Sequence, residues 1–220
     1  MGIVRGMKAI DAVISNQTAG SGEKVTWLKM EDKQSGRIRF MNELDEDSPN
    51  FDPTWGTAIV VGEHSNPKDY KRKAVCTEDT EGRCFGCEQH RKDYKAKWGA
   101  KQRYYTNVLF DDGKGNAPIV AVWSQGIFKN NTFAAIKEYF LDTNSLTNLT
   151  WKIKREGLST ETTYVLFPGQ PDAAPFDKTG LEPFDLDKVV KQIPYAEQEA
   201  FYMGVNGGAA AETTTTNIDW

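Results

Sequence analysis

Histidine and cysteine are scarce in this chain. Its 220 residues include two histidines, His64 and His90, and three cysteines, all within residues 76–87. An odd number of cysteines argues against a disulfide framework. There is no run of about 18 apolar residues that could span a membrane, and residues 1–15 lack the apolar stretch of a signal peptide. These absences predict a protein of a reducing cytoplasm, where clustered thiols more often bind a metal than form disulfides.

Sequence patterns of catalysis are also missing. There is no Gly-x-x-x-x-Gly-Lys-Ser/Thr phosphate loop. A zinc deaminase needs His-x-Glu and Pro-Cys-x-x-Cys, but Asn66 stands where that glutamate would be and Arg83 precedes Cys84. Because both histidines lie near the cysteines, no histidine is left as a general base. We therefore expect a protein that is not an enzyme; a zinc nuclease or deaminase with an open metal position is the rival hypothesis.

The net charge of -4 hides an uneven distribution. Residues 64–105 contain 11 Lys or Arg against 6 acids, whereas residues 172–220 contain 9 acids against 3 lysines. Local potential steers a charged ligand more than the net charge does. A basic middle followed by an acidic end therefore keeps nucleic acid among the candidate ligands.

The histidines and cysteines form one pattern, His64-x11-Cys76-x7-Cys84-x2-Cys87. Three thiolates and one imidazole complete a tetrahedral shell for Zn²⁺ and leave no position open for water, so the pattern predicts a structural zinc site. His90 follows Cys87 after two spacer residues, and it is the alternative fourth ligand. Gly86 is expected to supply the backbone freedom for a tight turn between the last two cysteines.

Strand-like stretches dominate the rest of the chain. Basic and apolar side chains alternate in residues 36–44, as expected for a strand with one buried face. Similar patterns predict one helix at 132–141 and strands at 25–30, 36–44, 57–62, 102–111, 117–123, 149–156 and 161–167. Together they indicate a mainly β (α+β) fold, an OB-fold-like Greek-key barrel with an inserted zinc-binding subdomain and a C-terminal helix.

Four segments follow from this assignment. We expect a flexible segment at 1–22 and an OB-fold core at 23–167, with the zinc subdomain at about 63–101. Residues 168–203 are expected to form a proline-rich connector and the C-terminal helix, which begins near 183. The Gly-, Ala- and Thr-rich residues 204–220 are expected to be a disordered tail.

Basic and aromatic residues alternate at short intervals around the metal pattern and on the polar sides of three predicted strands. Cations neutralise phosphates, and aromatic faces stack on unpaired bases, so this mixture is typical of a groove for single-stranded nucleic acid. The candidate contacts are Arg37, Arg39, Lys68, Tyr70, Lys71, Arg72, Lys73, Tyr94, Trp98, Lys101, Arg103, Tyr105, Lys152 and Lys154.

Two further interpretations concern protein partners. The same basic surface would suit a zinc-stabilised interaction protein that binds an acidic partner such as a host polymerase. The chain also ends on Asp219 and Trp220 after a flexible segment, and an acid beside a large apolar side chain makes a candidate docking peptide for replication proteins.

Several stretches resemble the single-stranded DNA-binding proteins of tailed phages. The metal pattern, the basic-aromatic segment after it and the run Tyr104-Tyr105-Thr106-Asn107-Val108-Leu109 resemble the core of the T-even phage helix-destabilising protein. The runs at 27–30, 37–40 and 63–70 are similar to single-strand-binding proteins of phages that infect actinobacteria. The resemblance covers about residues 25–167.

This resemblance implies a fold, a metal ligand and a role. It implies an OB-fold that binds single-stranded DNA without strong sequence preference, in phage DNA replication, recombination or repair. It implies His64 as the fourth ligand of a structural zinc, and an acidic C-terminal region that recruits replication partners. It also implies the cytoplasm of an infected bacterial host as the place of action.

Overall fold

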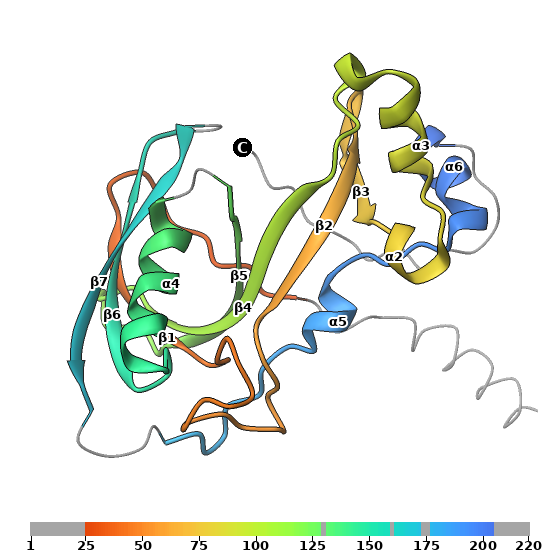
Figure 1. The fold of residues 1–220 in the computed structure, drawn as a ribbon. Helices are drawn as coiled ribbons and strands as arrows, with labels where there is room; N and C mark the ends of the chain where they lie inside the picture. The colour runs from red at the N-terminus through yellow and green to blue at the C-terminus, as the bar shows by residue number, and fades with distance from the viewer. Residues whose placement is uncertain (1–24, 129–130, 159–160, 173–176, 205–220) are drawn as a thin grey trace, which may run out of the picture.

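The computed structural model describes residues 25–128, 131–158, 161–172 and 177–204. The predicted flexible segment 1–22 and nearly all of the predicted tail, including Asp219 and Trp220, lie outside these residues. The described chain forms one seven-stranded sheet (Figure 1). Its strands are β1 (Ser35–Phe40), β2 (Ile59–Asn66), β3 (Asp69–Val75), β4 (Lys101–Asp111), β5 (Ile119–Gly126), β6 (Leu149–Glu156) and β7 (Thr163–Pro171).

Short helices accompany the sheet. They are α2 (Glu78–Glu81), α3 (Phe85–Lys92), the 3-10 helix η1 (Tyr94–Ala96), α4 (Asn131–Thr143), α5 (Leu186–Val189) and α6 (Tyr195–Met203). The predicted mainly β, α+β class is therefore confirmed.

All strand pairs of the sheet are antiparallel, and β4 is its centre. The order is β3-β2-β4-β1-β6-β7, and β5 also pairs with β4. The first half of β4 pairs with β2, where Ile59 lies opposite Tyr105, and its second half pairs with β1, where Phe40 lies opposite Val108. The long strand β4 thus pairs with the β2–β3 hairpin and is also one of the strands that enclose the main core.

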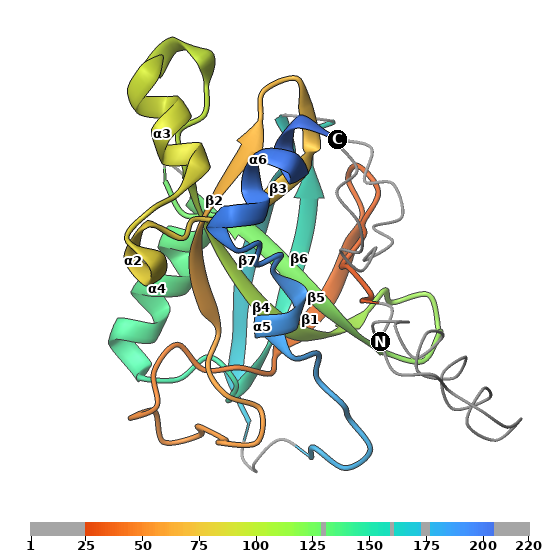
Figure 2. The same ribbon diagram turned by 90° about the vertical axis from the view of Figure 1, so that its right-hand side faces the viewer.

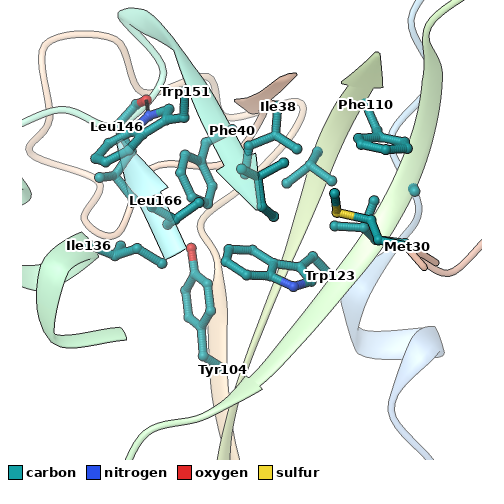
Figure 3. Close-up of a cluster of buried hydrophobic side chains, with 14 of the residues drawn as sticks. Met30, Ile38, Phe40, Tyr104, Phe110, Trp123, Ile136, Leu146, Trp151 and Leu166 are labelled. Carbon is teal, nitrogen blue, oxygen red and sulfur yellow. Dashed lines mark hydrogen bonds between the residues drawn. The ribbon is translucent and has the colours of Figure 1, made fainter. Parts of the chain in front are cut away.

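The main core lies on the inner face of β1, β4, β5 and β6. Period-two alternation in these strands sends Phe40, Trp123 and Trp151 inward, and each is at most 2% exposed. Figure 3 shows Phe40 between the two tryptophans, with ring centroids 6.0 Å from Trp123 and 5.5 Å from Trp151. Helix α4 packs on this core through Ile136. Burial of each such side chain contributes about 1.5–3 kcal/mol.

The alternate residues of the same strands form the outer face. Arg37 on β1 lies opposite Lys152 on β6 and Asp111 on β4. Because side chains on one strand face alternate sides, Arg103 and Tyr105 on β4 share this face with Asp111. The register therefore puts three pairs of the candidate contacts on one face of the sheet: Arg37 and Arg39 on β1, Arg103 and Tyr105 on β4, and Lys152 and Lys154 on β6.

The strand assignments differ from expectation at two places. Residues 25–30 make only an isolated bridge, in which Trp27 pairs with Val122. Strand β3 was not expected, because its sequence DYKRKAV has four charged residues and looks like a solvated loop. It forms because β2 offers a pairing edge, and because the cation of Lys73 meets the carboxylate of Glu63 at 3.1 Å.

The C-terminal helix expected from about 183 to 203 is two helices, α5 and α6, separated by residues 190–194. Pro194 explains the break, since the residue before a proline is forced out of the helical region. Residues 177–204 return across the sheet (Figure 2). Helix α5 covers Tyr105 and Val122 on the outer face, and α6 packs beside β2 and β3.

Candidate metal centre and nucleic-acid interface

Three elements bring the predicted metal ligands together. His64 lies near the end of β2, Cys76 follows β3, Cys84 is the N-cap residue of α3, and Cys87 is in the first turn of α3. One ligand atom from each residue lies within 4.8 Å of all the others. The Sγ atoms of Cys76 and Cys87 are 3.5 Å apart. This cluster, the metal centre below, is compatible with a bound metal.

Hydrogen bonding fixes the orientation of the His64 ring. Its Nδ1 atom lies 2.6 Å from the carbonyl oxygen of Trp98, and its Nε2 atom lies 3.3 Å from Sγ of Cys87. A carbonyl oxygen only accepts, so Nδ1 carries the proton and Nε2 offers its lone pair to the cluster. Metal-binding histidines are commonly held in this way by a carbonyl behind the ring.

Gly86 has a different role from the expected one. It lies in the first turn of α3, where its backbone does not need the freedom of glycine. A Cβ atom at Gly86 would lie 2.3 Å from Cγ of His64 and 2.6 Å from its Nδ1. The missing side chain therefore makes room for the imidazole of the metal centre.

The thiols differ in acidity. Burial raises the pKa of Cys76 and of Cys87. Burial also acts against ionisation of Cys84, but its interactions with His64 and with nearby backbone N–H groups lower its pKa to about 6. The Cys84 thiol can therefore ionise near neutral pH, whereas Cys76 and Cys87 need a cation beside them to ionise. This matters because a metal binds cysteine only as the thiolate.

Helix α6 holds the loop that carries the ligands. The side-chain oxygen of Gln198 accepts from the N–H of Phe85 at 2.8 Å, and its amide nitrogen donates to Oγ1 of Thr77 at 3.0 Å. Gln198 is fully buried. Sequence reasoning missed it, because a single glutamine 113 positions from Phe85 gives no local signal.

His90 does not belong to the metal centre. It is exposed on α3, and the part of the chain that the structure describes has one Cys/His cluster, with His64 in it. The alternative ligand of the sequence analysis is therefore wrong. His90 lies near Gly99 instead.

Some of the predicted nucleic-acid contacts are buried or paired inside the protein. Trp98 is 8% exposed in the apolar cluster around Phe85 and Tyr202, and Tyr105 is 1% exposed. These two rings are covered, so the expected stacking roles do not fit the structure. Lys73 donates to Glu63 and to the phenol oxygen of Tyr105, both at 3.1 Å, and burial lowers its pKa.

Other predicted contacts have internal partners but stay partly accessible. Arg103 donates to Ser124 at 3.0 Å, and Arg72 donates to Asp69 and to the carbonyl oxygen of Phe201. Arg39 pairs with Asp172, and Lys154 pairs with Glu156 at 2.8 Å.

The remaining candidates face solvent in two groups. The first group is at one end of the molecule, in the β2–β3 hairpin and beside η1 (Figure 1), and consists of Lys68, Tyr70, Lys71, Tyr94 and Lys101. Its tyrosines are well exposed, Tyr70 to 58% and Tyr94 to 71%. The second group is on the outer face, where Arg37 and Lys152 lie opposite each other.

Two exposed phenylalanines were missed. Phe167 on β7 lies opposite Lys152 and is 50% exposed; Phe128 after β5 is 76% exposed. A signal for Phe167 exists in the sequence: Tyr164 and Leu166 occupy the inward positions of β7, which leaves a large aromatic residue on the polar side of the alternation.

No family model, curated protein or solved structure matches this chain. None of the helices in the described ranges is long and apolar enough to cross a membrane.

Proposed function

We propose that this protein binds single-stranded DNA without strong sequence preference, and that it acts in phage DNA replication, recombination or repair. One observation carries the proposal. Arg37, Lys152 and Phe167 form a row across three adjacent strands of the outer face. Like charges directly opposite each other destabilise a sheet, and the one acid opposite Arg37 on its other side, Asp111, leaves these three residues with a net positive charge. The pair Arg37–Lys152 therefore favours an anionic ligand, and an exposed ring beside it can stack on a base.

The order of strands supports an OB-fold. Within the sheet, β5-β4-β1-β6-β7 are neighbours, and α4 lies between β5 and β6 in the chain. We take β1, β4, β5, β6 and β7 as the five strands of an OB barrel. Helix α4 then follows β5, the third strand of this barrel. In this assignment the β2–β3 hairpin and the metal centre are an insertion between the first two strands. OB-folds bind oligonucleotides on such strand faces.

The donor set supports zinc as the metal. Three thiols and one imidazole suit the borderline-soft Zn²⁺ better than hard cations, which prefer oxygen ligands. Four protein ligands fill a tetrahedral shell, so the ion would be structural. In this role His64, Cys76, Cys84 and Cys87 hold the hairpin and α3 together, and the protein is not an enzyme.

The proposal is tested by fluorescence anisotropy of labelled oligo-dT at several salt concentrations. We expect Arg37→Ala and Lys152→Ala each to weaken binding and to lower the salt slope, d log K/d log[salt], by about 0.7 for a lost phosphate contact. Lys137→Ala is the matched control, because Lys137 is exposed on α4, away from the outer face. Anisotropy suits this protein because Trp98, Trp123 and Trp151 are buried and respond weakly to a surface ligand.

An acidic protein partner is the second candidate, and the same basic groups favour it. Poly-glutamate and duplex DNA serve as competitors in the same assay. Length-dependent binding of oligo-dT, with weak competition by both, supports the single-strand proposal. Binding of labelled poly-glutamate, measured directly, without any binding of oligo-dT would replace it with the acidic-partner hypothesis.

The predicted docking role of Asp219 and Trp220 belongs to this proposal as well. Both residues lie outside the described part of the chain, so recruitment of replication proteins stays a prediction, as does action in the cytoplasm of an infected host.

A further inference from the structure

Phe128 is the most exposed of the large apolar side chains in the described residues, at 76%. It directly follows Ile127, whose side chain packs against the main core and whose N–H donates to the carbonyl oxygen of Gln102 at 3.2 Å. Phe128 lies in the turn that follows β5, and its high exposure shows that its ring faces solvent and not the core. An aromatic ring of this size exposed to water costs free energy that a stacked ligand would recover.

The surroundings of Phe128 are open and basic. Arg103 on β4 lies opposite Gly126, the last residue of β5, and the hydrogen bond from Ile127 to Gln102 continues this pairing by one residue. Phe128 therefore leaves β5 at the edge where Lys101 begins β4. A Cβ atom at Gly126, two residues before Phe128, would meet no atom of the described residues within 4 Å, so the surface at Gly126 is open. The one acid next to Lys101 in the sheet, Glu63, is 4% exposed and already accepts hydrogen bonds from Lys73 and Tyr105.

We propose that Phe128 and Lys101 form a binding site for one nucleotide of a single strand. The ring of Phe128 stacks on the unpaired base over the open surface at Gly126, and Lys101 binds the adjoining phosphate. The inference rests on the proposed function, and it extends that function from the row at Arg37, Lys152 and Phe167 to the start of β4. The positive charge of Lys101, with Arg103 behind it, favours a nucleotide over a neutral apolar ligand.

The experiment compares oligo-dT with an oligonucleotide of the same length that lacks bases. Phe128→Ala should lower the affinity for oligo-dT by about 5- to 150-fold, leave the affinity for the abasic strand unchanged and leave the salt slope unchanged. Phe128→Trp should restore the affinity, because the larger ring also stacks. Leu141→Ala is the control, since Leu141 is 70% exposed on α4 and should have no effect.

The outcomes separate this inference from the proposed function. If the wild-type protein and Phe128→Ala bind oligo-dT equally, with the same salt slope, the stacking site is refuted while single-strand binding stands. Equal weakening for oligo-dT and the abasic strand also refutes stacking. If the wild-type protein binds no oligonucleotide at all, both proposals fail.

Discussion

The buried carboxylate of Glu63 gives its neighbours a structural role. Its carboxylate is 4% exposed and accepts hydrogen bonds from Tyr105 at 2.8 Å and from Lys73 at 3.1 Å, with Arg103 at 3.9 Å. A buried charge without such partners would cost several kcal/mol. Lys73, Arg103 and Tyr105, which looked like nucleic-acid contacts in the sequence, are thus also the groups that stabilise a buried acid.

A substitution at Gly86 tests whether this glycine makes room for the His64 ring in the metal centre. We expect Gly86→Ala to displace the His64 ring, because the new methyl group would overlap its Cγ atom. The variant should lose bound metal, and overpacking should lower the free energy of unfolding by about 1–3 kcal/mol. Metal content by mass spectrometry and thermal unfolding measure the two effects.

The control for this variant is Gly126→Ala, where the added methyl group meets nothing within 4 Å. It should keep its metal and unfold within about 0.5 kcal/mol of the wild type. Full metal occupancy in Gly86→Ala would contradict the role assigned to this glycine.

At the scale of elements, α6 is the helix that completes the metal centre. Tyr202 is 1% exposed, stacks on Phe85 at 5.9 Å and meets Trp98 edge-on at 5.2 Å. Its hydroxyl donates to the carbonyl oxygen of His64 at 3.3 Å. The packing of α6 and the position of a metal ligand are therefore linked through one side chain.

We expect Tyr202→Ala to destabilise the protein by about 3–5 kcal/mol, the range for loss of a buried aromatic side chain. Metal affinity should fall as well, because the backbone of His64 loses its support. Chemical denaturation and competition with a coloured chelator measure these changes. Met203→Ala is the control, since Met203 is 52% exposed on the same helix; an equal loss in both variants would argue against a specific role of Tyr202.

Elements with strong local patterns were predictable from the sequence, and elements fixed by distant contacts were not. Alternation in β1, β4 and β6 is a local signal, and it predicted these strands at the right places. The spacing of Cys76, Cys84 and Cys87 is also local, and the structure brings these residues together with His64. Strand β3 has a charged sequence and depends on its pairing with β2. The return of α5 and α6 across the sheet depends on contacts more than 75 positions apart, such as Phe184 with Asn107, for which a single sequence contains no signal.

At the scale of the whole molecule, the described residues contain separate apolar clusters. The main core contains Phe40, Trp123 and Trp151, whereas Phe85, Trp98 and Tyr202 form a second cluster beside the metal centre. Strand β4 contributes Tyr104, Val108 and Phe110 to the main core and pairs with β2, which carries His64. The two clusters have no side chain in common, so they should respond differently to loss of the metal.

Removal of the metal tests whether the metal centre stabilises the folded protein. A strong chelator should lower the melting temperature, since metal binding adds directly to the stability of the folded state. Hydrogen exchange should rise first in β2, β3, α3 and α6, while amides of β1, β5 and β6 keep their protection. Metal analysis before chelation should find one zinc per chain. A metal-free protein with an unchanged melting temperature and exchange pattern would contradict the structural role of the centre.

The contact between Tyr202 and His64 also has a consequence for biosynthesis. The two residues are 138 positions apart, and ribosomes add about 5–20 residues per second. His64 of a nascent chain therefore waits for roughly 7–28 s, and the three cysteines wait for slightly less, before the helix that packs against this region has been made. During that interval three thiols are exposed to the cell, so early capture of the metal would protect them from oxidation until translation ends.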